Sequence, residues 1–174
     1  RTVEHGPIEV LLTVYEERGL TGAAGVKPGF FSAKRMINLD SEEDTAIFIG
    51  CAGGRDTRYE LKNRAAKAPK DSVGRKVTVL GLKGGHSGLN IHEHRGNAIK
   101  ILVRALQAAA AQMDVRLVAI DGGSMRNAIP RECEARVTVP KEQARKFKQV
   151  VDACFARIAA EELAGIDDGF AWKV

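Results

Sequence analysis

The pattern of apolar and polar positions is most regular in the last hundred residues. Apolar and polar side chains alternate over residues 134–139, which predicts a strand with one buried face. Apolar positions recur every three or four residues over 95–113 and 141–163, which predicts two amphipathic helices. Shorter apolar runs predict further strands at 76–82, 115–120 and 170–174. The order strand, helix, strand, strand, helix, strand is that of a ferredoxin-like domain.

The first third of the chain has a different pattern. Short, mostly apolar runs end at charged or glycine-rich stretches, as strands covered on both faces do in α/β sheets. These runs predict strands at 8–14, 35–39, 46–52 and 58–66. The segment 67–76, rich in charge and containing Pro, Ser and Gly, is the candidate boundary. We therefore expect an α/β protein with two parts, residues 1–68 and 69–174.

Composition narrows the class of protein. Of the 174 residues, 44% are hydrophobic and 28% charged, which is ordinary for a globular protein and excludes disordered and fibrous classes. The apolar runs are too short to span a bilayer, so we expect no membrane partner. The three cysteines fit no metal-binding or disulfide spacing, which indicates reduced thiols and a cytoplasmic location.

Charge is divided unevenly along the chain. The first 60 residues carry seven basic and ten acidic side chains, and the remaining residues carry 20 and 12. This asymmetry favours two functional parts. The isoelectric point near 9.2 is the one indication of a nucleic-acid binder. Because the basic residues are dispersed and aromatic residues are few, we expect no nucleic-acid partner.

Three carboxylates are candidates for hydrolytic chemistry. Glu16 and Glu17 follow the first predicted strand, and Asp40 follows the second. Carboxyl ends of parallel strands meet at one edge of a sheet, where such side chains could bind a divalent metal and activate water. The alternative is that all three are exposed loop acids, with Asp40 as a helix N-cap.

Two glycine-rich loops carry the remaining candidates. His86 lies among three glycines, where a neutral imidazole could stabilise an oxyanion; alternatively it is a surface histidine in a turn. Arg126 and Asn127 lie in a second glycine-rich loop, and the arginine could bind a carboxylate through two hydrogen bonds. The alternative for this second loop is an ordinary connection between strands.

Six strings of the sequence carry a family resemblance. They are LLTVYEERGLTGA, INLDSEE, FIGCAGG, LKGGHSGLNIH, RGNA and DGGSMRNAIPRE. In this order and spacing they resemble the aminoacyl-histidine dipeptidases of the cytosolic dinuclear-zinc dipeptidase family, over nearly the whole chain. The resemblance implies part of a zinc-peptidase catalytic α/β sheet, followed by a ferredoxin-like lid or dimerisation domain.

The same resemblance implies roles for the candidate residues. Glu16 matches the general base, and Glu17 and Asp40 match zinc ligands. His86 matches the lid histidine that stabilises the tetrahedral intermediate, and Asn127, beside Arg126, matches a position near the substrate. The implied cofactor is a pair of zinc ions, with manganese or cobalt as alternatives. The implied partners are a dipeptide substrate, preferably Xaa-His such as β-alanyl-histidine, and a second subunit of a homodimer.

Some residues that the family pattern requires do not occur in this sequence. An upstream His-x-Asp pair, a metal-bridging Asp and a C-terminal metal-binding His are all missing. We therefore expect an internal fragment of a dipeptidase that is inactive alone. The alternatives are another hydrolase of the family, acting on acyl-amino acids or tripeptides, and a non-catalytic interaction module of the lid type.

Overall fold

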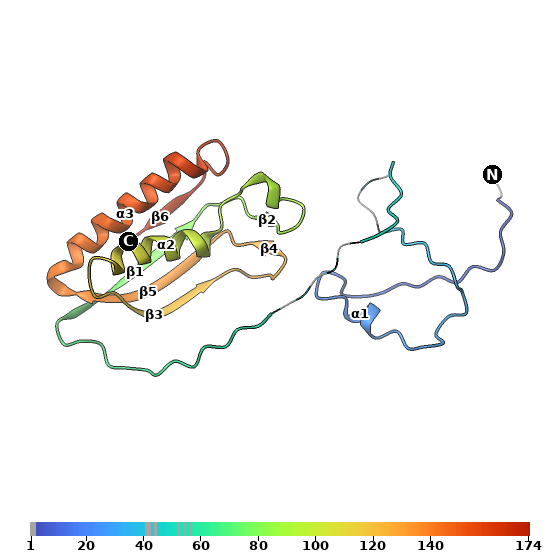
Figure 1. Cartoon of the computed structure of the whole chain (residues 1–174), viewed down its shortest axis with the longest axis horizontal. Coiled ribbons are helices and arrows are strands. Elements are labelled where there is room, and N and C mark those ends of the chain that lie inside the picture. The colour runs from blue at the N-terminus through green and yellow to red at the C-terminus, as the bar shows by residue number, and fades with distance from the viewer. Residues whose placement is uncertain (1–2, 41–42, 44, 52, 54, 56) are drawn as a thin grey trace. The chain divides into compact units, whose positions relative to one another are not determined.

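The computed structural model describes residues 3–40, 43, 45–51, 53, 55 and 57–174. The chain divides into two compact units, Arg1–Glu60 and Leu61–Val174. All strands in the described part of the chain belong to the second unit (Figure 1). The expected division after residue 68 stays a prediction.

The second unit is built on a four-stranded antiparallel sheet. Its strands are β1 (Ser72–Leu80), β3 (Arg116–Gly122), β5 (Cys133–Pro140) and β6 (Ala171–Lys173), in the spatial order β3-β5-β1-β6. β1 lies at the centre, between β5 and β6, with Val77 opposite Ala135. This order and the two helices between the strands confirm the predicted ferredoxin-like βαββαβ arrangement.

Two helices, α2 (Ala98–Ala110) and α3 (Ala144–Ile158), pack together and lie over one face of this sheet (Figure 1). A 3-10 turn, η2 (Lys141–Gln143), leads into α3, and a π-helical turn, η3 (Ala159–Leu163), continues it. The predicted span 141–163 is therefore helical throughout but changes its pitch twice.

The core lies between the sheet and the two helices. The predicted alternation in β5 is confirmed, because Ala135, Val137 and Val139 are almost fully buried. The apolar stripe predicted for 95–113 is confirmed in part, since Leu102 and Met113 are buried but Ile99 and Leu106 only partly so. Three alanines of α2 also face the core, Ala98, Ala105 and Ala109. Small side chains at these positions let the helix lie close to the sheet, and the larger ones pack along its flank.

The first unit contains one short helix, α1 (Thr21–Ala24). None of the four strands predicted before residue 67 forms among the described residues; three of them lie in the first unit, and the fourth, 58–66, crosses into the second. The apolar side chains of these runs are exposed; Leu12 is 88% and Ile49 100% accessible. A strand needs a neighbour for its backbone hydrogen bonds and a covering layer for its side chains, and the described residues form no strand beside these runs. Four residues of the quoted strings, Ser41, Glu42, Ala52 and Gly54, lie outside the described residues.

A search of the described residues finds no helix long and apolar enough to cross a membrane.

Candidate functional site

Glu16 and Glu17 lie together in one exposed turn of the first unit. The amides of Gly19 and Leu20 both donate to the backbone oxygen of Glu16, at 3.1 and 3.0 Å. Behind this turn, the Gly22 amide donates to the oxygen of Val14 at 3.1 Å, and a Cβ at position 22 would lie 2.5 Å from the Val14 nitrogen. Glycine at position 22 is therefore required for the close approach that brings α1 against the turn.

Asp40 is exposed, and its amide donates to Asn38 Oδ1 at 2.9 Å. Within the described residues no three His, Cys, Asp or Glu side chains come together in a way that could hold a metal ion. Zinc sites in proteins take about four ligands, usually nitrogen or sulfur with some oxygen. The candidate ligands Glu17 and Asp40 therefore do not make a zinc site by themselves.

A carboxylate that the sequence did not indicate connects the two candidate segments. Glu9 accepts hydrogen bonds from the amide and hydroxyl of Ser32, both at 2.8 Å, and from the amide of Ala33 at 3.0 Å. The Ala33 amide, followed by the Ser32 hydroxyl, lowers the pKa of the Glu9 carboxyl. Glu9 precedes Glu16 by seven residues and Ser32 precedes Asp40 by eight. This contact therefore joins the segment that leads to Glu16 to the segment that leads to Asp40.

In the second unit, the loop that carries His86 is tied to the loop that carries Arg126 and Asn127. β2 (Gly85–His86) pairs with β4 (Ala128–Ile129), with His86 opposite Ala128. The amide of Ser87 donates to the backbone oxygen of Asn127 at 2.8 Å. The three lid residues proposed from the sequence therefore lie on neighbouring segments of one surface.

The His86 ring is exposed, but its Nδ1 atom is engaged. It accepts hydrogen bonds from the amides of Gly88, at 3.1 Å, and Leu89, at 3.2 Å. A neutral imidazole that accepts at one nitrogen carries its proton on the other. We therefore assign the ring proton to Nε2, where it is able to donate to a ligand.

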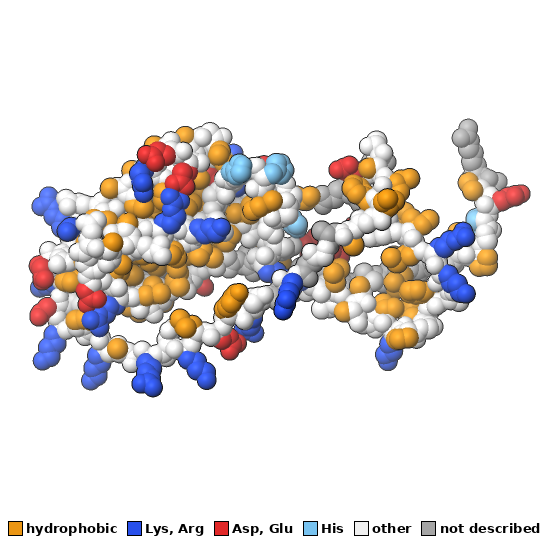
Figure 2. All heavy atoms as spheres, viewed as in Figure 1, with side chains coloured by type: hydrophobic (Ala, Val, Ile, Leu, Met, Phe, Trp, Pro, Cys, Tyr) orange, Lys and Arg blue, Asp and Glu red, His pale blue; other side chains and the backbone are white. Residues whose placement is uncertain are grey.

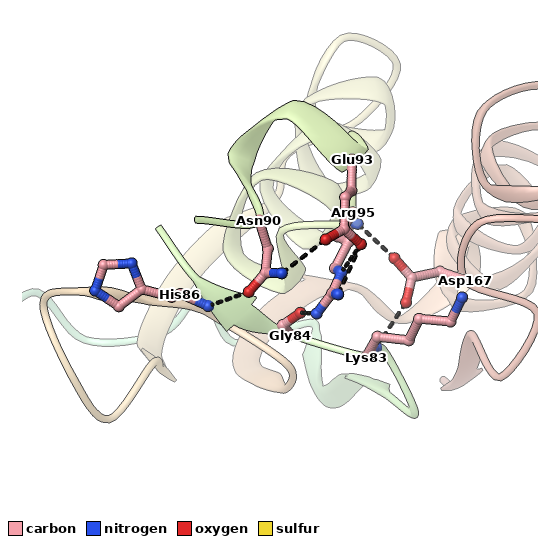
Figure 3. Close-up of polar contacts among 8 residues, drawn as sticks. Lys83, Gly84, His86, Asn90, Glu93, Arg95 and Asp167 are labelled. Atoms are coloured by element: carbon pink, nitrogen blue, oxygen red, sulfur yellow. Dashed lines mark hydrogen bonds and ion pairs between the residues drawn. The ribbon is translucent and has the colours of Figure 1, made fainter. Parts of the chain in front are cut away.

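A chain of polar contacts supports the His86 loop (Figure 3). Asn90 accepts from the His86 amide at 2.8 Å and donates to Glu93 at 2.7 Å. Arg95 pairs with Glu93 at 2.6 Å and donates to the Gly84 backbone oxygen at 2.6 Å. The hydrogen bond from Asn90, and then that from Arg95, lowers the pKa of the Glu93 carboxyl.

Asp167 holds the two ends of this loop together by hydrogen bonds. It is 1% exposed, and its two oxygens accept from the amides of Lys83 and Gly96, each at 2.6 Å (Figure 3). Neither Asp167 nor Asn90 is indicated as a functional residue by the sequence pattern. Both accept hydrogen bonds from backbone amides, and such contacts leave no signal in side-chain spacing.

Arg126 lies on a groove of about 850 Å³ beside the start of α2. Four cationic side chains line it, those of Arg95, Lys100, Arg104 and Arg126, with apolar side chains between them. Two of these cations are already paired, Arg104 with Glu162 at 2.5 Å and Arg95 with Glu93 at 2.6 Å, and Glu162 also lines the groove. A groove of this composition suits a small ligand that carries a carboxylate.

A family model for the peptidase dimerisation domain matches residues 74–165, which is more than half of the chain and runs from within β1 to two residues after η3. The chain belongs to this family. The expected lid-type domain is thereby confirmed.

Two relatives that share sequence with nearly the whole chain are named as dipeptidases. The chain is 44% identical over 162 residues to the cytosol non-specific dipeptidase of Escherichia coli (strain K12), covering 93% of this chain and 33% of the relative. The crystal structure of aminoacylhistidine dipeptidase from Vibrio alginolyticus matches 98% of this chain and 35% of its own, with 38% identity and a TM-score of 0.69. The resemblance found in the sequence is confirmed, and the chain spans about a third of the length of each relative.

Proposed function

We propose that this chain is part of a cytoplasmic metallopeptidase that hydrolyses dipeptides, preferably Xaa-His dipeptides of the β-alanyl-histidine type. The observation that carries the proposal is the geometry of His86. Its Nδ1 is held by two backbone amides, which leaves Nε2–H as a hydrogen-bond donor beside the loop of Arg126 and Asn127. Similarity to two dipeptidases supports the reaction class.

In this proposal each residue has one role in amide hydrolysis. Glu16 takes a proton from the attacking water and returns it to the leaving amine. The Nε2–H of His86 donates to the carbonyl oxygen as negative charge develops on it. Arg126 and Asn127 bind the carboxylate of the dipeptide, the arginine through paired hydrogen bonds.

Glu17 and Asp40 are proposed as metal ligands in a longer polypeptide. The family implies two zinc ions, with manganese or cobalt as alternatives, and these two carboxylates supply part of the ligand set. Because the described residues do not complete a site, we expect the 174-residue chain alone to hydrolyse no dipeptide.

We also propose that the parent protein is a homodimer joined through the second unit. The match to a peptidase dimerisation domain supports this, and so does the composition of β3, which lies at an edge of the sheet and exposes Leu117, Val118 and Ile120. Apolar side chains on an edge strand favour pairing with another chain.

The test uses the full-length protein that contains this chain. Purified enzyme is incubated with β-alanyl-histidine, other Xaa-His dipeptides, dipeptides without histidine, tripeptides and N-acyl amino acids, and the products are separated by chromatography. The proposal expects the highest kcat/KM for Xaa-His. A preference for tripeptides or acyl-amino acids would support another hydrolase of the family, and no hydrolysis at all would favour a non-catalytic interaction module.

Two variants then test the roles. We expect Glu16→Gln to lower kcat by about 10²–10⁴, because an amide does not accept the proton of water. Loss of an oxyanion donor costs about 10²–10³ in kcat, which is the expected effect of His86→Ala. Bound metal, measured by elemental analysis, should stay unchanged in both. Full activity of either variant would refute the role given to that residue.

A further inference from the structure

We propose that Asn90 is a positioning residue that fixes which nitrogen of the His86 ring carries the proton. The inference rests on the proposed function in one respect only, namely that His86 donates from Nε2 to the reacting oxygen. Nothing about Asn90 itself requires contact with a substrate.

Asn90 forms a tight turn with His86 through two hydrogen bonds to the His86 backbone, one made by its side chain and one by its backbone amide. Its side-chain Oδ1 accepts from the His86 amide at 2.8 Å, and its own amide donates to the His86 carbonyl oxygen at 3.0 Å. The turn between them brings the amides of Gly88 and Leu89 to 3.1 and 3.2 Å from Nδ1. These two donors exclude a proton from Nδ1 and leave it on Nε2.

The orientation of the Asn90 amide is itself determined by its neighbours (Figure 3). Glu93 is an acceptor when ionised, so the Nδ2 group of Asn90 must face it, and it does at 2.7 Å. Oδ1 is then directed at the His86 amide. Arg95 holds Glu93 in turn, through Nε at 2.8 Å and through its ion pair.

The line of contacts ends on rigid backbone. Arg95 donates to the carbonyl oxygen of Gly84, one residue before β2, and Gly96, the residue after Arg95, donates to the buried carboxylate of Asp167. The position of the Asn90 side chain is therefore tied to the fold and does not depend on a bound ligand.

The test reads the ring directly, by nitrogen NMR of the histidine side chains of the 174-residue chain at a pH where they are neutral. His86→Gln identifies the His86 signals. The wild-type ring is expected as a single form with Nε2–H. In Asn90→Ala we expect a mixture of both tautomers, and amide exchange of Gly88 and Leu89 faster by about five- to tenfold, the factor for one lost hydrogen bond.

Two further variants separate positioning from general stability. Asn97→Ala removes the N-cap of α2, where Asn97 accepts from the Lys100 amide at 3.1 Å, and should leave the His86 signals unchanged. Asn90→Asp places a carboxylate against Glu93, and the double variant Asn90→Asp/Glu93→Gln restores a donor facing an acceptor. We expect the double variant to return the ring towards the single Nε2–H form.

Three results would overturn the proposal: a wild-type ring protonated on Nδ1 or in mixed form, an unchanged ring in Asn90→Ala, or an equal change in Asn97→Ala. A double variant no closer to wild type than Asn90→Asp would also contradict it. None of these measurements involves turnover. Failure of the dipeptidase assay would therefore refute the proposed function without touching the tautomer assignment.

Discussion

The carboxylate of Asp167 accepts a hydrogen bond from the backbone amide of Gly96, 71 residues earlier in the chain, at 2.6 Å. Its other oxygen accepts from the Lys83 amide, at the opposite end of the loop that carries His86. The Asp167 side chain and Gly96 are both buried, so the Gly96 amide depends on this carboxylate for a partner. One acidic residue near the C-terminal strand thus fixes both ends of the candidate site loop.

Replacing this carboxylate should cost stability. Asp167→Ala leaves the amide of the buried Gly96 and that of the more exposed Lys83 without this acceptor. A buried unsatisfied amide costs about 1–3 kcal/mol and a part-buried one less, so we expect a loss of about 1–4 kcal/mol in the free energy of unfolding. Chemical denaturation measures it. The matched control is Asp168→Ala, since Asp168 is exposed and accepts from the Gly165 amide alone, at 2.8 Å. Equal losses in the two variants would contradict the role given to Asp167.

A second prediction concerns Gly85. Its φ of +140° lies in the region that favours glycine, and an added Cβ would lie 2.6 Å from Arg95 Nη1 and 2.7 Å from Asn90 Oδ1. Gly85→Ala should therefore destabilise the unit by about 1–3 kcal/mol and displace the network beneath His86. Gly74→Ala is the control, because a Cβ there meets nothing within 4 Å. Unfolding curves that coincide for the two variants would refute the prediction.

The fold of the second unit was predictable because its signals are local. Alternation in β5 and the apolar periodicity of α3 are properties of neighbouring residues, and both were recovered in the structure. The buried face of α2 was predicted only in part, at Leu102, because alanine carries little periodic signal although Ala105 and Ala109 are fully buried. The strands predicted before residue 67 do not form among the described residues, because an apolar run alone does not supply a neighbouring strand, and strand pairing is not a local property.

The candidate site also contains residues that the sequence indicates and residues that it does not. His86, Arg126 and Asn127 were indicated by glycine-rich loops and by family resemblance, and they lie on neighbouring segments. Asp167 was not indicated, because its partners lie 71 and 84 residues away and are backbone amides. Sequence spacing therefore identifies exposed residues that could contact a ligand more readily than the buried residues that hold their loops in place.

The ion pair between α2 and η3 makes a pH-dependent contribution. The hydrogen bond from Arg104 is the main cause that lowers the pKa of Glu162 below its ordinary 4.5. The stabilisation is thus present above the unfolded pKa and lost as pH falls through the folded one. Both side chains are more than 40% exposed, so we expect at most about 1 kcal/mol.

Carbon NMR titration of the carboxyl groups measures this shift. In Arg104→Gln the pKa of Glu162 should rise towards its ordinary value, and the acid-dependent loss of stability should shrink. Glu161→Gln is the control, since it keeps Arg104 and Glu162. A Glu162 titration that is the same with and without Arg104 would refute the assignment.

The last prediction tests the proposed dimer at the edge of the sheet. The order β3-β5-β1-β6 leaves β3 at one edge, with Val118 62% exposed at an irregularity in its pairing with β5. A lysine there would bury an unpaired charge in the interface. Such a charge costs about 3–5 kcal/mol, so Val118→Lys should weaken association at least about 100-fold.

The unit is already rich in positive charge, and basic side chains follow one another along the segment that leads into β1 (Figure 2). A control is therefore needed for the effect of one more positive charge away from β3. Gln149→Lys adds the same charge at an exposed position of α3. Sedimentation equilibrium of the three proteins should show a dimer for the wild type and Gln149→Lys, and a monomer for Val118→Lys. A monomeric wild type, or equal dissociation of both variants, would remove β3 as the interface, because a general increase in positive charge acts on both variants alike.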